Sequence, residues 1–320
     1  MTALEIPKKL AGQRLDAALA SLAPDLSLRA RRRLIDNGSV LVNGKPGRAG
    51  QRLRVGDTLE LRAPADTATS SNNEFLQSVR LVATQGDFAL LAKPAGLHSV
   101  SLAGSDTSSL ESCLPQLLPN NPAARLLQRL DRDTSGLVCV ALSDTAAEVF
   151  RQWEHRGQCR KHYVALLQGE LAASITATRA IDTNQRLKSR VTVDEAPSVR
   201  HTSFEPLACG PLCEFLPEMT GSTQPVTLAG CVIHRGCRHQ IRAHAAHVGH
   251  PLVGDSLYDS SEPGLQEDCP GTFWLHAAAI VAPRLRCTLQ PAWHMAPQAL
   301  TAVEKWLETL PRYGIDNSVI

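Results

Sequence analysis

Two aspartates and two arginines stand close together in the middle of the chain, directly before an apolar segment. These residues are Arg129, Asp131, Arg132 and Asp133. They are followed by the small polar turn 134–136 and by the wholly apolar residues 137–142, a pattern that predicts a buried strand. A carboxylate at the edge of such a strand, paired with a guanidinium, stays ionised and can act as a nucleophile or an electrostatic stabiliser. A surface loop of ion pairs is the alternative interpretation, because charged turns are common in proteins.

Four histidines later in the chain raise the question of a metal site. They are His239, His244, His247 and His250. The zinc-protease motif H-E-x-x-H needs a glutamate after its first histidine, but Ala245 follows His244. The nine cysteines include no C-x-x-C pair, and their scatter predicts reduced thiols. We therefore expect no metal, and a metal-dependent hydrolase is a remote alternative.

The composition predicts a chain of two domains that does not enter a membrane. With 320 residues, 43% of them apolar, the length favours two cores over one. No segment approaches the roughly 18 uncharged apolar residues of a membrane helix, and the N-terminus lacks the apolar run of a signal peptide. We expect a cytoplasmic protein. Neither of the glycine-rich nucleotide-binding motifs is present, and we expect no cofactor.

Positive charge is concentrated in the first 64 residues. They contain twelve Lys and Arg against six Asp and Glu, a net charge of +6, whereas the whole chain carries +2, which leaves −4 for the rest. Such a basic head predicts a polyanionic partner, because phosphate neutralisation supplies most non-specific nucleic-acid affinity. Ser27 can cap a helix over 28–36, on which Arg29, Arg32 and Arg33 share one stripe. We expect this stripe to face phosphates, with a plain solvated surface as the alternative.

The hydrophobic pattern predicts the elements that position these residues. In the head we expect helices over 12–22 and 28–36, a strand over 40–42 that turns at Asn43-Gly44, and a strand over 55–61. Residues 65–78 are mostly polar and predict a flexible linker. Beyond them we expect strands over 88–92 and 160–167 and a helix over 143–156 that Gly157 ends. The poorly patterned residues 204–230 indicate an insertion or a long hairpin.

Several of these segments resemble the RluA-like pseudouridine synthases. Residues 128–136, Q-R-L-D-R-D-T-S-G, match the family signature H-R-L-D-x-D-T-S-G at every fixed position but the first. The family's K-P-x-G turn begins at Lys93, before this signature, and its K-x-Y-x-A strand begins at Lys161, after it. The family's G-R-x-H-Q-I-R element matches residues 236–242, with Cys237 in place of the usual arginine, and its G-H-P-[IL]-x-G-D-x-x-Y loop matches residues 249–258. Residues 13–61 resemble the small RNA-binding module named after ribosomal protein S-four.

This resemblance implies the isomerisation of uridine to pseudouridine in RNA, without a cofactor. It makes Asp131 the catalytic residue, pairs Arg242 with it, and places Tyr163 against the target base. Attack on the ribose and attack on the base ring both remain open. The RNA-binding candidates are Arg29, Arg32, Arg33, Lys93, Arg129, Lys161, Arg238, His239 and Gln240.

The implied fold is α+β, with a mixed, largely antiparallel sheet in a catalytic domain over 79–320. A small α/β RNA-binding head over 1–64 and the linker 65–78 precede it. We expect a monomer that acts on structured RNA, with large-subunit ribosomal RNA favoured and transfer RNA as the alternative. The departures at Gln128 and Cys237 leave a second class of function open, a non-catalytic RNA-binding or ribosome-assembly protein that keeps the fold.

Overall fold

The computed structural model divides the chain into two compact units. The described residues are 2–21, 31, 34–35, 40–48, 50–61, 78–101, 109–185, 187–259 and 273–311. One unit comprises Met1–Gln77 with Ser101–Ser108, and the other comprises Ser78–Val100 with Ser109–Ile320. Most of the predicted helix over 28–36, including Arg29, Arg32 and Arg33, lies outside the described residues. The same holds for nearly all of the predicted linker over 65–78.

The N-terminal unit contains a small antiparallel sheet and a short helix. Its described strands are β1 (Thr2–Glu5), β2 (Val40–Val42), β3 (Lys45–Pro46) and β4 (Thr58–Leu61), in the order β1-β4-β2-β3. Helix α1 (Leu15–Ala18) passes into the 3-10 turn η1 (Leu19–Ser21), so the helix predicted over 12–22 begins later than expected. The turn at Asn43 and Gly44 is confirmed, and their φ values of 52° and 77° suit a tight hairpin between β2 and β3.

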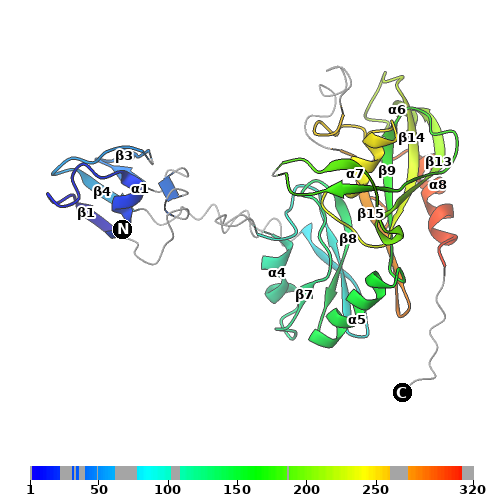
Figure 1. Cartoon of the computed structure of the whole chain (residues 1–320), viewed down its shortest axis with the longest axis horizontal. Helices are drawn as coiled ribbons and strands as arrows, with labels where there is room; N and C mark the ends of the chain where they lie inside the picture. The colour runs from blue at the N-terminus through cyan, green and yellow to red at the C-terminus, as the bar shows by residue number, and fades with distance from the viewer. Residues whose placement is uncertain are drawn as a thin grey trace. The chain divides into compact units, whose positions relative to one another are not determined.

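The second unit is built on one large sheet (Figure 1). Its described strands run in the order β10-β13-β14-β9-β15-β8-β6-β5, with β16 beside β15 and β7 beside β8. Their bounds are Arg80–Gln85 (β5), Phe88–Lys93 (β6), Arg125–Leu126 (β7), Ser135–Ala141 (β8), Arg160–Gln168 (β9), Ile175–Ala177 (β10), Thr202–Pro211 (β13), Pro225–Ile233 (β14), Leu275–Ala282 (β15) and Leu285–Thr288 (β16). The pairing of β15 with β8 is parallel, and the neighbouring pairings of β9 with β15 and of β6 with β8 are antiparallel. The predicted mixed, largely antiparallel sheet is thus confirmed.

Helices pack on both faces of this sheet. Ile280 belongs to an apolar cluster with α5 (Asp144–His155), whereas Val281 belongs to another with α8 (Pro297–Glu308). Consecutive strand residues point to opposite faces, so the two helices cover opposite sides of β15. The other described elements of this unit are α4 (Leu110–Leu117), β11 (Arg179–Asp182), β12 (Arg190–Glu195), η2 (Ser198–Arg200), α6 (Leu212–Phe215) and α7 (Gln240–His247). None of the described helices is long and apolar enough to cross a membrane.

Helix α5 forms where the sequence predicts it, for identifiable reasons. The Ser143 hydroxyl caps its first turn by accepting a hydrogen bond from the N–H of Ala146 at 3.1 Å. Phe150 and Trp153 are buried in the core against β6 and β8. Gly157, with a φ of 68°, lies just beyond the end of the helix, where a left-handed residue commonly stops one.

The tract 204–230 is a long hairpin that belongs to the central sheet. Strands β13 and β14 pair from Thr202 with Ile233 to Pro211 with Pro225, and α6 lies between them. On the far side, β14 pairs along almost the whole length of β9. The hairpin therefore supports the strand that carries Tyr163, and of the two readings of this tract the hairpin is confirmed.

Candidate active site

A cavity of about 620 Å³ lies where the loop before β8 meets β9 and the start of α7. Asp131 lines it from the loop, Tyr163 from β9 and Arg242 from α7. Asp131 and Arg242 are 111 positions apart in the chain and still touch. The fold thus brings together the three residues predicted to be catalytic.

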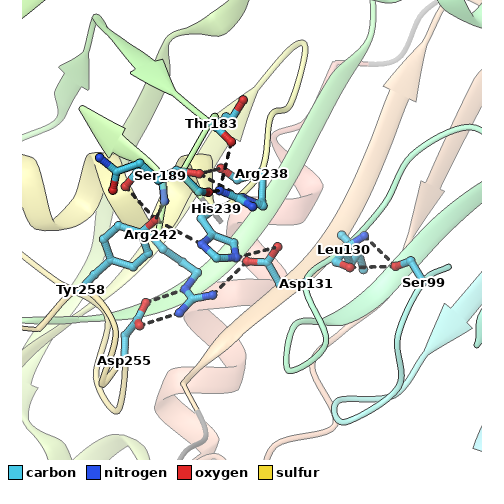
Figure 2. A network of polar contacts seen from close by, with 11 residues as sticks. Ser99, Leu130, Asp131, Thr183, Ser189, Arg238, His239, Arg242, Asp255 and Tyr258 are labelled. Atoms are coloured by element: carbon cyan, nitrogen blue, oxygen red, sulfur yellow. Dashed lines mark hydrogen bonds and ion pairs between the residues drawn. The ribbon is translucent and has the colours of Figure 1, made fainter. Parts of the chain in front are cut away.

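The backbone on both sides of Asp131 is fixed by the last residue of β6 and by the segment that follows it. The Ser99 hydroxyl donates to the carbonyl of Leu130 at 2.8 Å and accepts from its N–H at 2.9 Å (Figure 2). Lys93 Nζ donates to the carbonyl of Arg132 at 2.9 Å, and the N–H of Gly96 donates to the same oxygen at 2.9 Å. These bonds hold residues 130 and 132, so the loop presents Asp131 in a fixed place.

Arg242 is the cation that faces Asp131, and a second carboxylate orients it. Its Nη1 donates to Asp131 Oδ2 at 3.2 Å, while Nε and Nη2 donate to the two oxygens of Asp255 at 2.6 and 2.7 Å (Figure 2). The rings of Phe273 and Tyr258 lie 4.2 and 5.2 Å from the guanidinium carbon. Burial by itself lowers the pKa of Arg242, but hydrogen bonds and charge from Asp255 and Asp131 outweigh it and raise the pKa. Arg242 therefore carries its charge at any working pH.

His239 lies beside Asp131 on the same wall of the cavity. Its φ of 56° places it in the left-handed region at the N-terminus of α7. Its Nε2 is 4.0 Å from Asp131 Oδ1, and its Nδ1 is 3.1 Å from the hydroxyl of Tyr258. That hydroxyl also accepts from the N–H of Ser189 and donates to its carbonyl, at 2.8 and 3.0 Å. Burial lowers the pKa of His239, whereas the charge of Asp131 acts in the opposite direction.

Tyr163 and Lys161 point to the same face of β9, as their spacing predicts, and both line the cavity. Burial raises the pKa of Tyr163, and the charge of Asp131 raises it further, so the phenol stays neutral. Lys161 is buried and forms an ion pair with Glu154 of α5. It is thus a paired cation at the cavity wall.

Three of the predicted RNA-binding residues donate hydrogen bonds to the protein backbone. Lys93 is 2% exposed, and its ammonium donates hydrogen bonds to the carbonyls of Pro94, Leu97 and Arg132. The ammonium therefore does not face a phosphate. Burial lowers the pKa of Lys93 to about 7 against the charges of Asp133 and Asp131. The buried amide of Gln240 donates to the carbonyl of Arg200 at 2.8 Å, and Arg238 donates to the carbonyl of Thr183 at 3.1 Å. Arg129, by contrast, is exposed at the rim of the cavity.

Sequence reasoning did not identify Asp255, Ser99 or Tyr258 as parts of the site. Asp255 and Tyr258 belong to a segment, 249–258, that has a family motif, so a signal existed but did not reveal the contact with Arg242. Ser99 carries no comparable signal. Its two hydrogen bonds join segments 31 positions apart and depend on the folded chain.

The two departures from the family motifs leave the ion pair of Asp131 with Arg242 in place. Gln128 is buried, and its Nε2 donates to the carbonyl of Leu137 at 3.1 Å, so the side chain supports the start of β8. Cys237 is partly buried at the cavity wall, where burial raises the pKa of its thiol. Neither departure disrupts the ion pair of Asp131 with Arg242.

The four histidines do not converge on a common point. His244 bonds the hydroxyl of Thr202 and the carbonyl of Arg179, each at 2.8 Å, and His250 bonds the carbonyl of Gln168 at 2.9 Å. Within the part of the chain that the structure describes, no group of three His, Cys, Asp or Glu side chains is placed to hold a metal ion.

Comparison with known proteins agrees with this geometry. Residues 87–247 match the model of the RNA pseudouridylate synthase family, and residues 13–59 match the S4 domain. The chain is 30% identical over 258 residues to the ribosomal large subunit pseudouridine synthase D of Xanthomonas campestris, covering 79% of this chain and 73% of the relative. It is 28% identical over 264 residues to the ribosomal large subunit pseudouridine synthase C of Vibrio vulnificus, covering 80% and 79%.

A solved structure shares the fold. The human RNA pseudouridylate synthase domain containing 1 superposes with a TM-score of 0.56 at 23% identity, over 74% of this chain and 97% of the human one. The matching family model covers the loop of Asp131, the strand of Tyr163 and the helix of Arg242. The chain belongs to the RNA pseudouridylate synthase family, as an enzyme with an S4 domain at its N-terminus.

Proposed function

We propose that this enzyme converts uridine to pseudouridine in large-subunit ribosomal RNA, with Asp131 as its nucleophile. The observation that carries the proposal is the ion pair of Asp131 with Arg242 at 3.2 Å, inside a cavity that Tyr163 also lines. The relatives in Xanthomonas and Vibrio are both named as pseudouridine synthases of the ribosomal large subunit. Transfer RNA is the competing substrate.

The reaction breaks the N1–C1′ bond and joins C1′ to C5, while one proton leaves C5 and one is gained at N1. A carboxylate nucleophile divides this exchange into two easier steps. Arg242 aims the carboxylate of Asp131 through their hydrogen bond, because Asp255 fixes the guanidinium. The neutral phenol of Tyr163 packs against the uracil, which must leave its stack to enter the cavity. Attack on C1′ and attack on the base ring both fit these roles.

The proposal extends to the organisation of the chain. Residues 1–64 form the RNA-binding head, 65–78 link it, and 79–320 form the catalytic domain. One chain supplies Asp131, Tyr163 and Arg242, so a monomer suffices. The isomerisation involves no net redox change and no external group, so it needs neither metal nor cofactor. Action on ribosomal RNA places the enzyme in the cytoplasm.

The test is to map pseudouridine across total RNA from cells with the gene, without it, and with Asp131→Asn in its place. Asn keeps the size of the side chain but removes its negative charge and most of its nucleophilicity. We expect one or more large-subunit sites to lose pseudouridine in the deletion strain and to stay unmodified in the Asn strain. Full modification by a folded Asn variant would overturn the role of Asp131. A loss confined to transfer RNA would overturn the substrate.

A further inference from the structure

A second groove, of about 510 Å³, adjoins the catalytic cavity on the side of α5. Its lining residues are Glu148, Arg151, Gln152, Glu154, His155, Arg156 and Arg235. Glu154 and Arg235 line both hollows, so the groove continues the wall of the cavity that holds Asp131. A ligand that extends out of the cavity along this wall therefore enters the groove.

The carboxylates that line this groove do not neutralise all of its arginines. Glu148 pairs with Arg151, and Glu154 pairs with the buried Lys161. Both carboxylates are therefore occupied. Arg156 and Arg235 are exposed, and neither guanidinium has a hydrogen-bond or ion-pair partner among the described residues. Two free guanidiniums beside two satisfied ion pairs leave a surface that attracts an anion.

The two free arginines stand on a fixed frame. His234 Nδ1 lies 2.9 Å from the carbonyl of Gly157, which ties the residue before Arg235 to the residue after Arg156. The N–H of Arg235 donates to the carbonyl of Val199 at 2.8 Å. The backbones that carry the guanidiniums are thus held in the folded protein, and the groove needs little reorganisation to receive a ligand.

We propose that this groove, called here the α5 groove, binds the phosphates of the RNA strand that runs away from the target uridine. RNA is the occupant that fits, because the uridine in the cavity is joined to a chain of phosphates and guanidiniums are the preferred partners of phosphate. The cavity itself is lined by seven cationic side chains against three carboxylates among the described residues, so the positive field is continuous with the groove. This inference rests on the proposed function and adds a path for the substrate that the three catalytic residues do not define.

The test compares the full-length protein with the double variant Arg156→Gln plus Arg235→Gln. The probe is a fluorescently labelled RNA hairpin with uridines in its loop, titrated over a range of salt concentrations. For every phosphate that the variant no longer neutralises, the slope of log Kd against log salt should fall by about 0.7 to 0.9. We expect weaker binding at low salt, by a similar factor for hairpins of different loop sequence, because phosphate contacts carry no sequence information.

Arg80→Gln is the matched control. Arg80 is an exposed residue of β5, lines neither hollow, and has no side-chain partner among the residues that the structure describes. The variant removes the same kind of charge from a residue outside the groove. We expect Arg80→Gln to leave the salt slope close to that of the wild type. A salt slope for the double variant equal to that of Arg80→Gln would overturn the α5 groove.

A charge-retaining variant tests whether charge on the two arginines is what binds RNA. A turnover assay distinguishes failure of the groove from failure of the proposed function. Arg156→Lys plus Arg235→Lys keeps the charge, and we expect it to recover most of the salt slope that the Gln variant loses. Failure to recover it, with an unchanged melting temperature, would show that charge on these residues is not what binds RNA. If the wild-type protein forms no pseudouridine, the proposed function fails. If it forms pseudouridine while the Gln variant binds like Arg80→Gln, only the groove fails.

Discussion

The position of Asp131 is set mainly by hydrogen bonds to the backbone of the residues on either side of it. The residue before it is held by Ser99 and the residue after it by Lys93 and Gly96, which lie at the end of β6 and in the segment that follows. Arg242 then approaches its carboxylate from α7. A reacting group must be held within a fraction of an ångström of its productive position. If Asp131 is the proposed nucleophile, we expect these backbone contacts to matter for catalysis as well as for stability.

Ser99→Ala should therefore lower turnover as well as stability. The change leaves the N–H and the carbonyl of Leu130 without their buried partner, at a cost of about 1–3 kcal/mol in unfolding free energy. We expect kcat to fall while RNA affinity stays close to wild type, because Ser99 acts through the position of Asp131. Single-turnover kinetics, RNA titration and thermal melting test this. An unchanged kcat per folded molecule would mean that Ser99 serves stability alone.

Thr134→Val is the stability control for that experiment. Thr134 lies in the same loop, is buried, and has a hydroxyl with no hydrogen-bond partner among the described residues. Removing a buried hydroxyl that bonds to nothing should be neutral or stabilising. A loss of stability as large as that of Ser99→Ala would show that any polar change in this loop has the same effect.

Asp255→Asn tests the orientation of Arg242. The buried guanidinium would lose its two-pronged partner, and removing one member of a buried ion pair typically costs about 3–5 kcal/mol. We expect a lower melting temperature and a loss of turnover in the protein that remains folded, since Arg242 is no longer aimed at Asp131. Asp144→Asn is the comparison, because its exposed pair with Arg125 should contribute only about 0–1 kcal/mol. Equal effects of the two variants would contradict the predicted role of Asp255.

At the scale of elements, one glycine lets the strand of the site approach its neighbour. Gly136 in β8 has a φ of 115°, and a Cβ at this position would lie 2.3 Å from the carbonyl oxygen of Ala277 in β15. This is where the parallel pairing of β8 with β15 occurs. The glycine of the T-S-G turn is thus required by packing at the base of the Asp131 loop.

Gly136→Ala should destabilise the catalytic domain strongly. The strained backbone costs of order 1–3 kcal/mol, and the clash with a neighbouring strand adds roughly 1–3 kcal/mol more. Gly86→Ala separates the two effects, because Gly86 also has a positive φ, 55°, but open space around its Cβ position. Chemical denaturation of both variants measures the difference. A Gly136→Ala variant as stable as Gly86→Ala would show that β15 moves aside without cost.

Local pattern was enough to predict several elements but not their pairing. Helix α5 and strand β9 were predicted close to their observed bounds, because capping and alternation are local signals. The membership of tract 204–230 in the central sheet depends on pairing with β9, which no local pattern encodes. Lys93 is an example, at the site, of a contact that local pattern does not encode. Its turn was recognised, but a long-range contact with the loop of Arg132 determines where its ammonium lies.

At the scale of the whole molecule, the chain combines a catalytic unit with a basic head. The head carries a net charge of +6 within residues 1–64, and these residues include the region that matches the S4 domain. The catalytic cavity and the α5 groove belong to the other unit. If both regions bind the same RNA, as proposed, we expect them to share the total affinity.

Removal of residues 1–64 should therefore weaken RNA binding and flatten its salt dependence without unfolding the catalytic domain. For every phosphate that the head neutralises, its removal should reduce the slope of log Kd against log salt by about 0.7 to 0.9. The measurement is a salt titration of hairpin binding, with thermal melting to show that the remaining chain is folded. Equal affinity and equal slope for the truncated protein would contradict a role for the head.

The same deletion combined with Arg156→Gln and Arg235→Gln tests whether the two surfaces act independently. The head and the α5 groove belong to different compact units, and changes at independent sites usually add. We expect the combined protein to show the sum of the two changes in salt slope. A larger combined change would mean that the head and the groove can neutralise the same phosphates, because each surface then compensates when only the other is removed. A smaller combined change would mean that removing one surface already breaks the phosphate contacts of the other.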